Sequence, residues 1–123
     1  MSAEPRTVTL RTSDRGDVTI PEPAWCIGHA LHDPETAYVD LGHHSARTVL
    51  NFQGRTIGEA RITQTPYTEG GTRAAYASVY LLLDGADVGP AGLYDFAGRL
   101  DAHADQLRAL ADQLAAILDG GDR

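Results

Sequence analysis

The chain has 123 residues, of which 42% are hydrophobic and 22% charged, and its formal net charge is −7. This length suits one domain with a real core, because a domain of this size buries roughly two-thirds of its unfolded surface. The acidic balance excludes a phosphate-backbone binder, which needs a basic face. One cysteine excludes an internal disulfide, and no apolar run is long enough for a signal peptide or a bilayer span. We therefore expect one cytoplasmic domain over residues 1–123, with neither nucleic acid nor membrane as a partner.

The first predicted element is a β-hairpin over residues 7–20. Apolar and polar residues alternate on both sides of an Asp-Arg-Gly turn at residues 14–16. Pro21 and Pro23 are expected to end the pairing, because proline has no amide hydrogen for a ladder. Residues 21–36 then form an ordered loop.

Four more strands are expected before the helix, all within residues 37–83. Their ranges are 37–44, 48–52, 55–66 and 74–83. Gln53 and Gly54 supply a turn between two of them, and Gly58 interrupts the long strand in a way that is typical of a β-bulge. The last strand is the most apolar, so we expect it to lie in the centre of the sheet.

Residues 90–118 predict one long C-terminal helix. Gly89 and Pro90 suit its start, and Gly120 lies where a helix ends. Leucines recur every seven residues from Leu93, and further apolar positions follow three and four residues after each, which makes a broad stripe. The expected fold class is α+β: an antiparallel sheet of about five to six short strands packed by this amphipathic helix.

The same helix is a candidate interface for a homodimer. At about 1.5 Å per residue it would span roughly 44 Å, whereas a compact domain of this size is only about 35 Å across. The helix must therefore bend near Gly98 or extend past the sheet and expose apolar residues that need a partner. His103 lies in the stripe, either as an ordinary half-buried residue or as one that sets the register of a dimer. The candidate interface residues are Leu100, His103, Leu107, Leu110, Leu114, Ile117 and Leu118.

A candidate metal site lies within residues 26–44, which hold the only cysteine and four of the five histidines. Cys26-x-x-His29 has the spacing of a ligand pair on a loop, and thiolate with imidazole suits Zn²⁺ better than Mg²⁺. Adjacent side chains of a strand point to opposite faces, so only one of His43 and His44 could face the loop. The ligand set that we expect is Cys26, His29 and His43, completed by Asp40 or water.

Two other interpretations of this cluster stay open. Cys26 could be an ordinary small buried residue, with the histidines exposed and without a role. Cys26 could also pair with a histidine as nucleophile and base, or the zinc site could be hydrolytic with Glu35 or Asp40 as base. Because the sequence holds no oxyanion-hole motif, P-loop, dinucleotide fingerprint or nucleophile elbow, we expect a non-enzymatic protein.

Residues 18–29 read Val-Thr-Ile-Pro-Glu-Pro-x-Trp-Cys-x-x-His, and Asp40-x-x-His43 and an Ala/Leu-rich C-terminal helix follow. This order resembles a family of small actinobacterial domains of unknown function, and the resemblance covers most of the chain. It implies no activity. It favours Cys26, His29, Asp40 and His43 over the other histidines of the cluster.

Together these patterns favour a non-enzymatic accessory or regulatory domain. The Cys/His loop would be fixed by Zn²⁺, and the helix would mediate self-association. A small metal-dependent hydrolase using the same cluster is the first alternative. A monomeric, metal-free adaptor that binds an unknown protein partner is the second.

Overall fold

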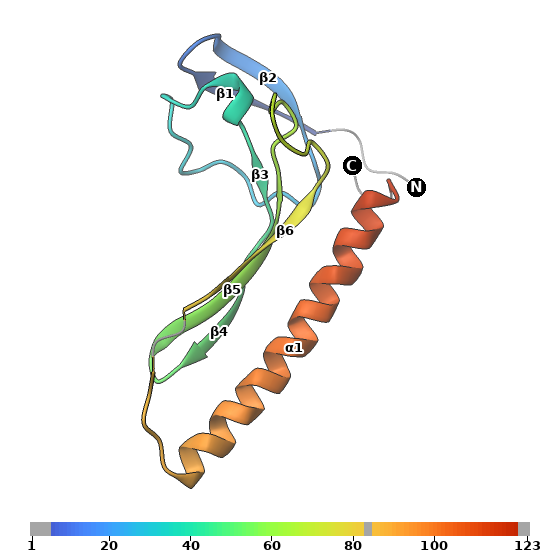
Figure 1. Ribbon diagram of the computed structural model, residues 1–123. Helices are drawn as coiled ribbons and strands as arrows, with labels where there is room; N and C mark the ends of the chain where they lie inside the picture. The colour runs from blue at the N-terminus through green and yellow to red at the C-terminus, as the bar shows by residue number, and fades with distance from the viewer. Residues whose placement is uncertain (1–5, 83–84, 121–123) are drawn as a thin grey trace.

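The computed structural model describes residues 6–82 and 85–120, and it has the expected α+β fold (Figure 1). Six short strands, one 3₁₀ helix and one long α-helix make up this part of the chain. In chain order the elements are β1 (Arg6–Thr12), β2 (Gly16–Glu22), η1 (Tyr38–Asp40), β3 (His43–His44), β4 (Thr48–Phe52), β5 (Arg55–Gln64), β6 (Tyr76–Leu81) and α1 (Pro90–Leu118). The strands form two antiparallel sheets rather than one: β1 pairs with β2, and β3, β4 and β6 all pair with β5.

The N-terminal hairpin forms where the alternation predicts it, but it is longer. β1 and β2 pair from Thr12 opposite Gly16 to Arg6 opposite Glu22, so Pro21 lies inside a strand instead of ending it. Proline is tolerated there because β2 is an edge strand of a two-stranded sheet. Its second edge pairs with none of the described strands, so the missing amide hydrogen is not needed there. The extension carries Glu22 to the end of β2, toward the loop that follows.

The prediction of a strand at residues 37–44 is mostly wrong. Residues 38–40 form η1, in which the Asp40 amide donates to the Ala37 carbonyl at 3.0 Å, and only His43 and His44 pair as a strand. Tyr38 accounts for the turn: its amide donates to the Asp14 carboxylate at 2.9 Å, and its ring stacks on Tyr67 with 4.5 Å between centroids. These partners are far away in the sequence, so the local alternation cannot reveal them.

The centre of the larger sheet is β5, not the apolar strand β6. β6 pairs with β5 alone, and its residues are mostly exposed. β3 and β4 occupy the other edge of β5 one after the other. The irregularity expected at Gly58 is present beside it, because Leu50 pairs with Gly58 and Asn51 with Thr56, which leaves one unpaired residue between them.

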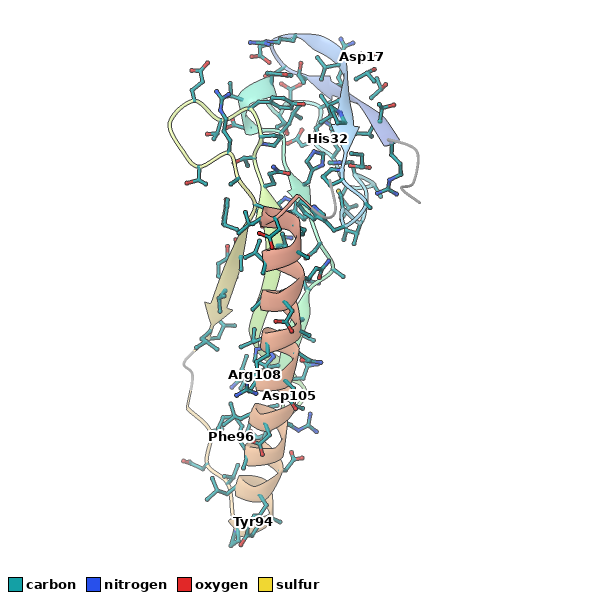
Figure 2. All side chains as sticks on the ribbon, turned by 90° about the vertical axis from the view of Figure 1, so that its right-hand side faces the viewer. Asp17, His32, Tyr94, Phe96, Asp105 and Arg108 are labelled. Atoms are coloured by element: carbon teal, nitrogen blue, oxygen red, sulfur yellow. The ribbon has the colours of Figure 1, made fainter. Side chains whose placement is uncertain are left out.

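α1 has the predicted bounds, with Gly89 as N-cap, Pro90 in its first turn and Gly120 in the left-handed region at φ 82°. It runs unbroken along one face of the larger sheet (Figure 1). Phe96 contacts Phe52 of β4, with 4.7 Å between ring centroids. The opposite face of the helix is exposed to solvent. Arg108 Nη1 and Asp105 Oδ1 form an ion pair there at 3.0 Å (Figure 2).

The helix stripe packs on the molecule's own sheet, so the alternative in which the helix extends past the sheet and exposes its C-terminal apolar residues is wrong for most of them. Leu110 is buried in a core with Trp25, Ala60, Ile62 and Ala75, and three more stripe residues pack partly buried against it: Leu107, Leu114 and Ile117. His103 is buried as well, with its Nδ1 3.4 Å from Gln106 Oε1. Only Leu100 and Leu118 of the candidate interface are largely exposed, at 43% and 54%.

The molecule is elongated, with two separate cores. Asp17 and His32 lie at one end and Tyr94 at the other (Figure 2). The second core, in the hairpin end, is formed by Leu10, Ile20 and Leu41, with Val8, Val18, Tyr38 and Tyr67 packed around them. No helix among the described residues is both long and apolar enough to cross a bilayer. The segment from Glu22 to His43, which contributes Trp25 to one core and Leu41 to the other, contains the candidate site.

Candidate metal centre

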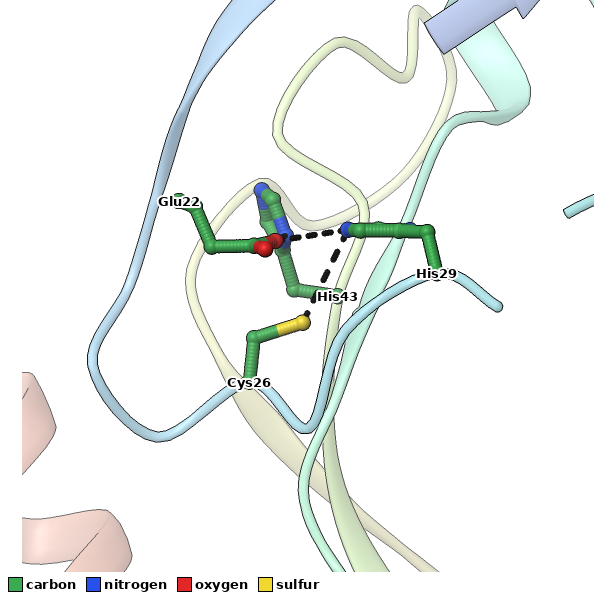
Figure 3. Close-up of side chains that lie close together, drawn as sticks. All are labelled: Glu22, Cys26, His29 and His43. Carbon is green, nitrogen blue, oxygen red and sulfur yellow. Dashed lines mark hydrogen bonds and ion pairs between the residues drawn. The ribbon is translucent and has the colours of Figure 1, made fainter. Parts of the chain in front are cut away.

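Four potential ligand side chains converge where the hairpin meets the larger sheet (Figure 3). Glu22 comes from the end of β2, Cys26 and His29 come from the following loop, and His43 comes from β3. One donor atom from each residue lies within 4.8 Å of all the others. Residues from three chain segments therefore meet at one point.

His29 is in contact with two of the other three donors. Its Nε2 lies 2.6 Å from Glu22 Oε1 and 3.7 Å from Cys26 Sγ, and His43 Nδ1 lies 3.3 Å from the same Glu22 oxygen. Tetrahedral zinc, with bonds of about 2.0–2.3 Å, holds its ligands roughly 3.3–3.8 Å apart. Two of the three distances already match this spacing, and the Glu22–His29 distance is that of a short hydrogen bond.

Backbone hydrogen bonds give the loop its shape. The Cys26 amide donates to the Pro23 carbonyl at 3.1 Å, which closes a turn directly after β2. Gly28 has a φ of +103°, a conformation that glycine adopts without strain, and its amide donates to Cys26 Sγ at 3.5 Å. The Ile27 amide donates to the His44 carbonyl at 3.0 Å, so the loop is also attached to β3.

The four side chains are removed from water. Cys26 and His43 are 6% and 2% exposed, and the side chains of Glu22 and His29 are each 11% exposed. Burial raises the pKa of the Cys26 thiol, and the neighbouring Glu22 raises it further. Burial lowers the pKa of His43, as does the nearby His29. At neutral pH the thiol is therefore protonated and the His43 ring is neutral.

Glu22 is the anionic member of the group. Burial alone would raise the pKa of its carboxyl, but hydrogen bonds from Cys26 and His29, with the attraction to the protonated forms of His29 and His43, outweigh burial and lower it. The carboxylate stays ionised in a place where an isolated charge would be costly. Its partners supply the compensation.

One donor atom of the group lacks a partner. His43 Nδ1 is fully buried and makes no hydrogen bond, although Glu22 Oε1 is 3.3 Å away. A buried polar atom without a partner costs about 1–3 kcal/mol. In one tautomer of the neutral imidazole, Nδ1 carries a lone pair. A metal ion would accept that lone pair and give the nitrogen a partner.

Three of the four expected ligand residues are thus in the group, and Asp40 is not. Asp40 is exposed on η1, and the alternative base Glu35 is exposed on the preceding loop. The fourth member is Glu22, which the sequence pattern did not single out as a ligand. The sequence does contain an indication of this ligand, because Glu22 lies only four residues before Cys26. The prediction that pairing ends at Pro21 left Glu22 outside the strand, so its position beside the loop was not recognised.

The structure also places the two remaining histidines of residues 26–44. His32 lies outside the group, with its Nε2 2.7 Å from the Arg11 carbonyl oxygen. His44 points to the other face of the strand, and its Nδ1 is 3.3 Å from Thr63 Oγ1. Strand alternation correctly limits the group to one of two adjacent histidines.

A cavity of about 390 Å³ lies next to the group, and both Glu22 and His43 form part of its wall. Its other walls are mostly apolar, from Trp25, Tyr67, Ile117 and neighbouring residues, with the Arg6 side chain at one side. Trp25 meets the His43 ring edge-on, with 6.3 Å between ring centroids. The candidate centre therefore has a tryptophan and a cavity on one side.

A family model described as Domain of unknown function (DUF6907) matches residues 7–116. This range includes the hairpin, all four members of the group and most of α1. No curated protein and no solved structure shows a significant match to the chain.

Proposed function

Since the chain belongs to the DUF6907 family of domains of unknown function, we propose that it is a non-enzymatic accessory or regulatory domain with a structural zinc site. The ligands would be Glu22, Cys26, His29 and His43. The observation that carries this proposal is the convergence of four donors, two buried and two mostly buried, within 4.8 Å of one another.

The donor set suits zinc. One thiolate sulfur and two imidazole nitrogens favour a borderline-soft ion over Mg²⁺ or Ca²⁺, which prefer oxygen ligands. A carboxylate is a known fourth ligand type for zinc. Four protein donors would fill a tetrahedron, and a filled tetrahedron is typical of a structural rather than a catalytic zinc ion.

A metal ion at this place would hold separate parts of the fold together. Glu22 belongs to the hairpin, whereas His43 belongs to the larger sheet, and the two sheets share no ladder. One ion would link both sheets and the intervening loop. The proposal suits a cytoplasmic protein, because a reducing compartment keeps the single thiol available as a ligand.

Native mass spectrometry of the full chain, purified without chelator and then offered Zn²⁺, tests the proposal. We expect one zinc per chain in the wild type and none in Cys26→Ser. His32→Ala is the matched control and should keep its zinc, because His32 lies outside the group. A wild-type chain that takes up no zinc would overturn the proposal and favour the metal-free adaptor.

The cavity of about 390 Å³ supports a metal-dependent hydrolase as the second candidate, since Glu22 and His43 form part of its wall. In that case Glu22 would act as a base beside an ion held by the other three residues, with an open position toward the cavity. The zinc-loaded chain would then hydrolyse an activated ester or phosphodiester. Glu22→Gln would keep its zinc affinity but lose the activity, whereas the structural proposal expects the zinc affinity itself to fall.

A further inference from the structure

The outer edge of β6 has no partner strand in the part of the chain that the structure describes. β6 hydrogen-bonds to β5 on one side only. Residues 74–82, which include all of β6, carry no charged side chain. Edge strands of natural proteins are usually protected by charges, prolines or bulges that prevent pairing with another chain. Such protection is missing along β6.

The same strand exposes large apolar side chains. The exposed fraction is 58% for Val79, 57% for Tyr80, 60% for Leu81 and 65% for Leu82, and Tyr76 is 39% exposed. Because successive side chains of a strand point to opposite faces, Val79 and Leu81 lie on one face of β6 and Tyr76 and Tyr80 on the other, so this apolar patch covers both faces of the edge. Contiguous exposed apolar surface marks interaction sites on proteins.

Part of this patch lies on the sheet face that carries α1. Val79 and Leu81 pair with Ala60 and Gly58, and Ala60 is in the core beneath Leu110 of the helix. α1 lies mainly against β4, where Leu50 and Phe52 are buried. The helix therefore covers one side of this face and leaves the side along β6 open.

We propose that two copies of the chain associate through β6, paired antiparallel about a two-fold axis at Val79. A two-fold axis perpendicular to the sheet reverses the strand direction and keeps the face, so both helices would lie on the same side of one continuous sheet. Each Val79 would face its copy, and Ala77 would face Leu81. The Val79 and Leu81 side chains of both copies would then cover the part of the sheet face that lies between the two helices.

A second copy also fits the charge of this edge. An isologous contact needs a self-complementary surface, and an uncharged strand paired with itself brings no like charges together although each copy carries −7. A contact limited to one strand and its exposed side chains is smaller than a standard interface, which buries roughly 800 Å² per partner. The dimer should therefore be reversible and concentration-dependent. It does not depend on the zinc site.

Sedimentation velocity of the full chain over the micromolar range tests this proposal. We expect wild-type protein to shift from monomer to dimer with concentration and Val79→Lys to stay monomeric, because two lysines would meet at the axis. Leu31→Lys is the matched control: Leu31 is 98% exposed on the loop before η1 and should leave the dimer intact. Wild-type protein that is monomeric at all concentrations would overturn the proposal. A dimer that survives Val79→Lys but is lost in Leu93→Lys would overturn it in favour of the helix.

Cross-linking tests the register separately. In the proposed pairing the two Val79 Cα atoms are about 4.5–5.5 Å apart, within the usual range for a disulfide. Val79→Cys treated with diamide, which takes up the two electrons and two protons that the thiols lose, should give a covalent dimer on a non-reducing gel. Wild-type protein, whose Cys26 is buried, and Leu31→Cys should not. Equal cross-linking of Leu31→Cys would overturn the register.

Discussion

His29 Nε2 lies 2.6 Å from Glu22 Oε1, and this contact joins the loop of the Cys/His cluster to the end of the N-terminal hairpin. The same nitrogen is 3.7 Å from Cys26 Sγ. His29 is thus the residue that the carboxylate and the thiol share, and a metal ion at this place would take ligands from both sheets. The loop is part of a connection between two sheets rather than a self-contained motif.

The identity of the fourth ligand is the sharpest test of this geometry. Glu22→Gln removes the negative charge and keeps the shape, so we expect zinc affinity to fall by about 100-fold or more, since even indirect partners of zinc ligands change it by about 10–100-fold. Asp40→Asn should leave the affinity unchanged because Asp40 is exposed and outside the group. Competition with a zinc-binding dye measures both. An equal loss in the two variants would contradict the assignment.

Zinc binding should release a proton and strengthen with pH. Burial raises the pKa of Cys26, so the metal-free thiol is protonated at neutral pH, and zinc must displace that proton to bind the thiolate. Apparent affinity should therefore rise about tenfold per pH unit between pH 7 and 8. His43 adds little competition there, because burial lowers its pKa.

Calorimetry in two buffers of different ionisation enthalpy measures the protons released, and we expect about one per zinc. Cys26→Ala, at zinc concentrations high enough to bind, should release none. An enthalpy that does not depend on the buffer would show that the thiol is not a ligand.

Metal removal should loosen the site but not the whole fold. Ligand binding to the native state contributes about 2.7 kcal/mol at a zinc concentration 100 times the dissociation constant. A chelator should therefore lower the melting temperature and raise hydrogen exchange in residues 23–36 and β3, while α1 stays protected. Trp25, the only tryptophan, meets the His43 ring edge-on, so its fluorescence should change in parallel. Identical exchange with and without chelator would contradict a structural role.

Elements with local signals could be predicted from the sequence. α1 has its own start at Gly89-Pro90, its own end at Gly120 and a regular apolar repeat, and its bounds are those predicted. The hairpin has its turn residues between two alternating segments, and the Gln53-Gly54 turn has positive φ at both residues. In each case the residues that determine the structure lie within the element itself.

Features that depend on distant partners could not be predicted in this way. η1 forms because Tyr38 meets Asp14 and Tyr67, and Pro21 continues β2 because no further strand pairs there. The apolar composition of β6 was mistaken for a central position, although composition does not distinguish a buried strand from an exposed edge that needs a partner. The Glu22 ligand position was missed for the same reason as the longer β2.

The helix stripe itself gives the last prediction, because two of its leucines differ in burial. Leu110 is 9% exposed in the core with Trp25 and Ile62, whereas Leu100 is 43% exposed in the same heptad pattern. Leu110→Ala should lower the free energy of unfolding by about 2–5 kcal/mol, as buried leucines do. Leu100→Ala should cost less than about 1 kcal/mol, since it removes little buried surface and alanine favours a helix.

Urea denaturation of both variants, with zinc present and at one protein concentration, measures this difference. A Leu100→Ala variant as unstable as Leu110→Ala would mean that Leu100 is also covered, and the helix would then be the dimer interface after all. A large difference between the two would place the stripe's contribution within one chain and leave β6 as the surface for a second copy.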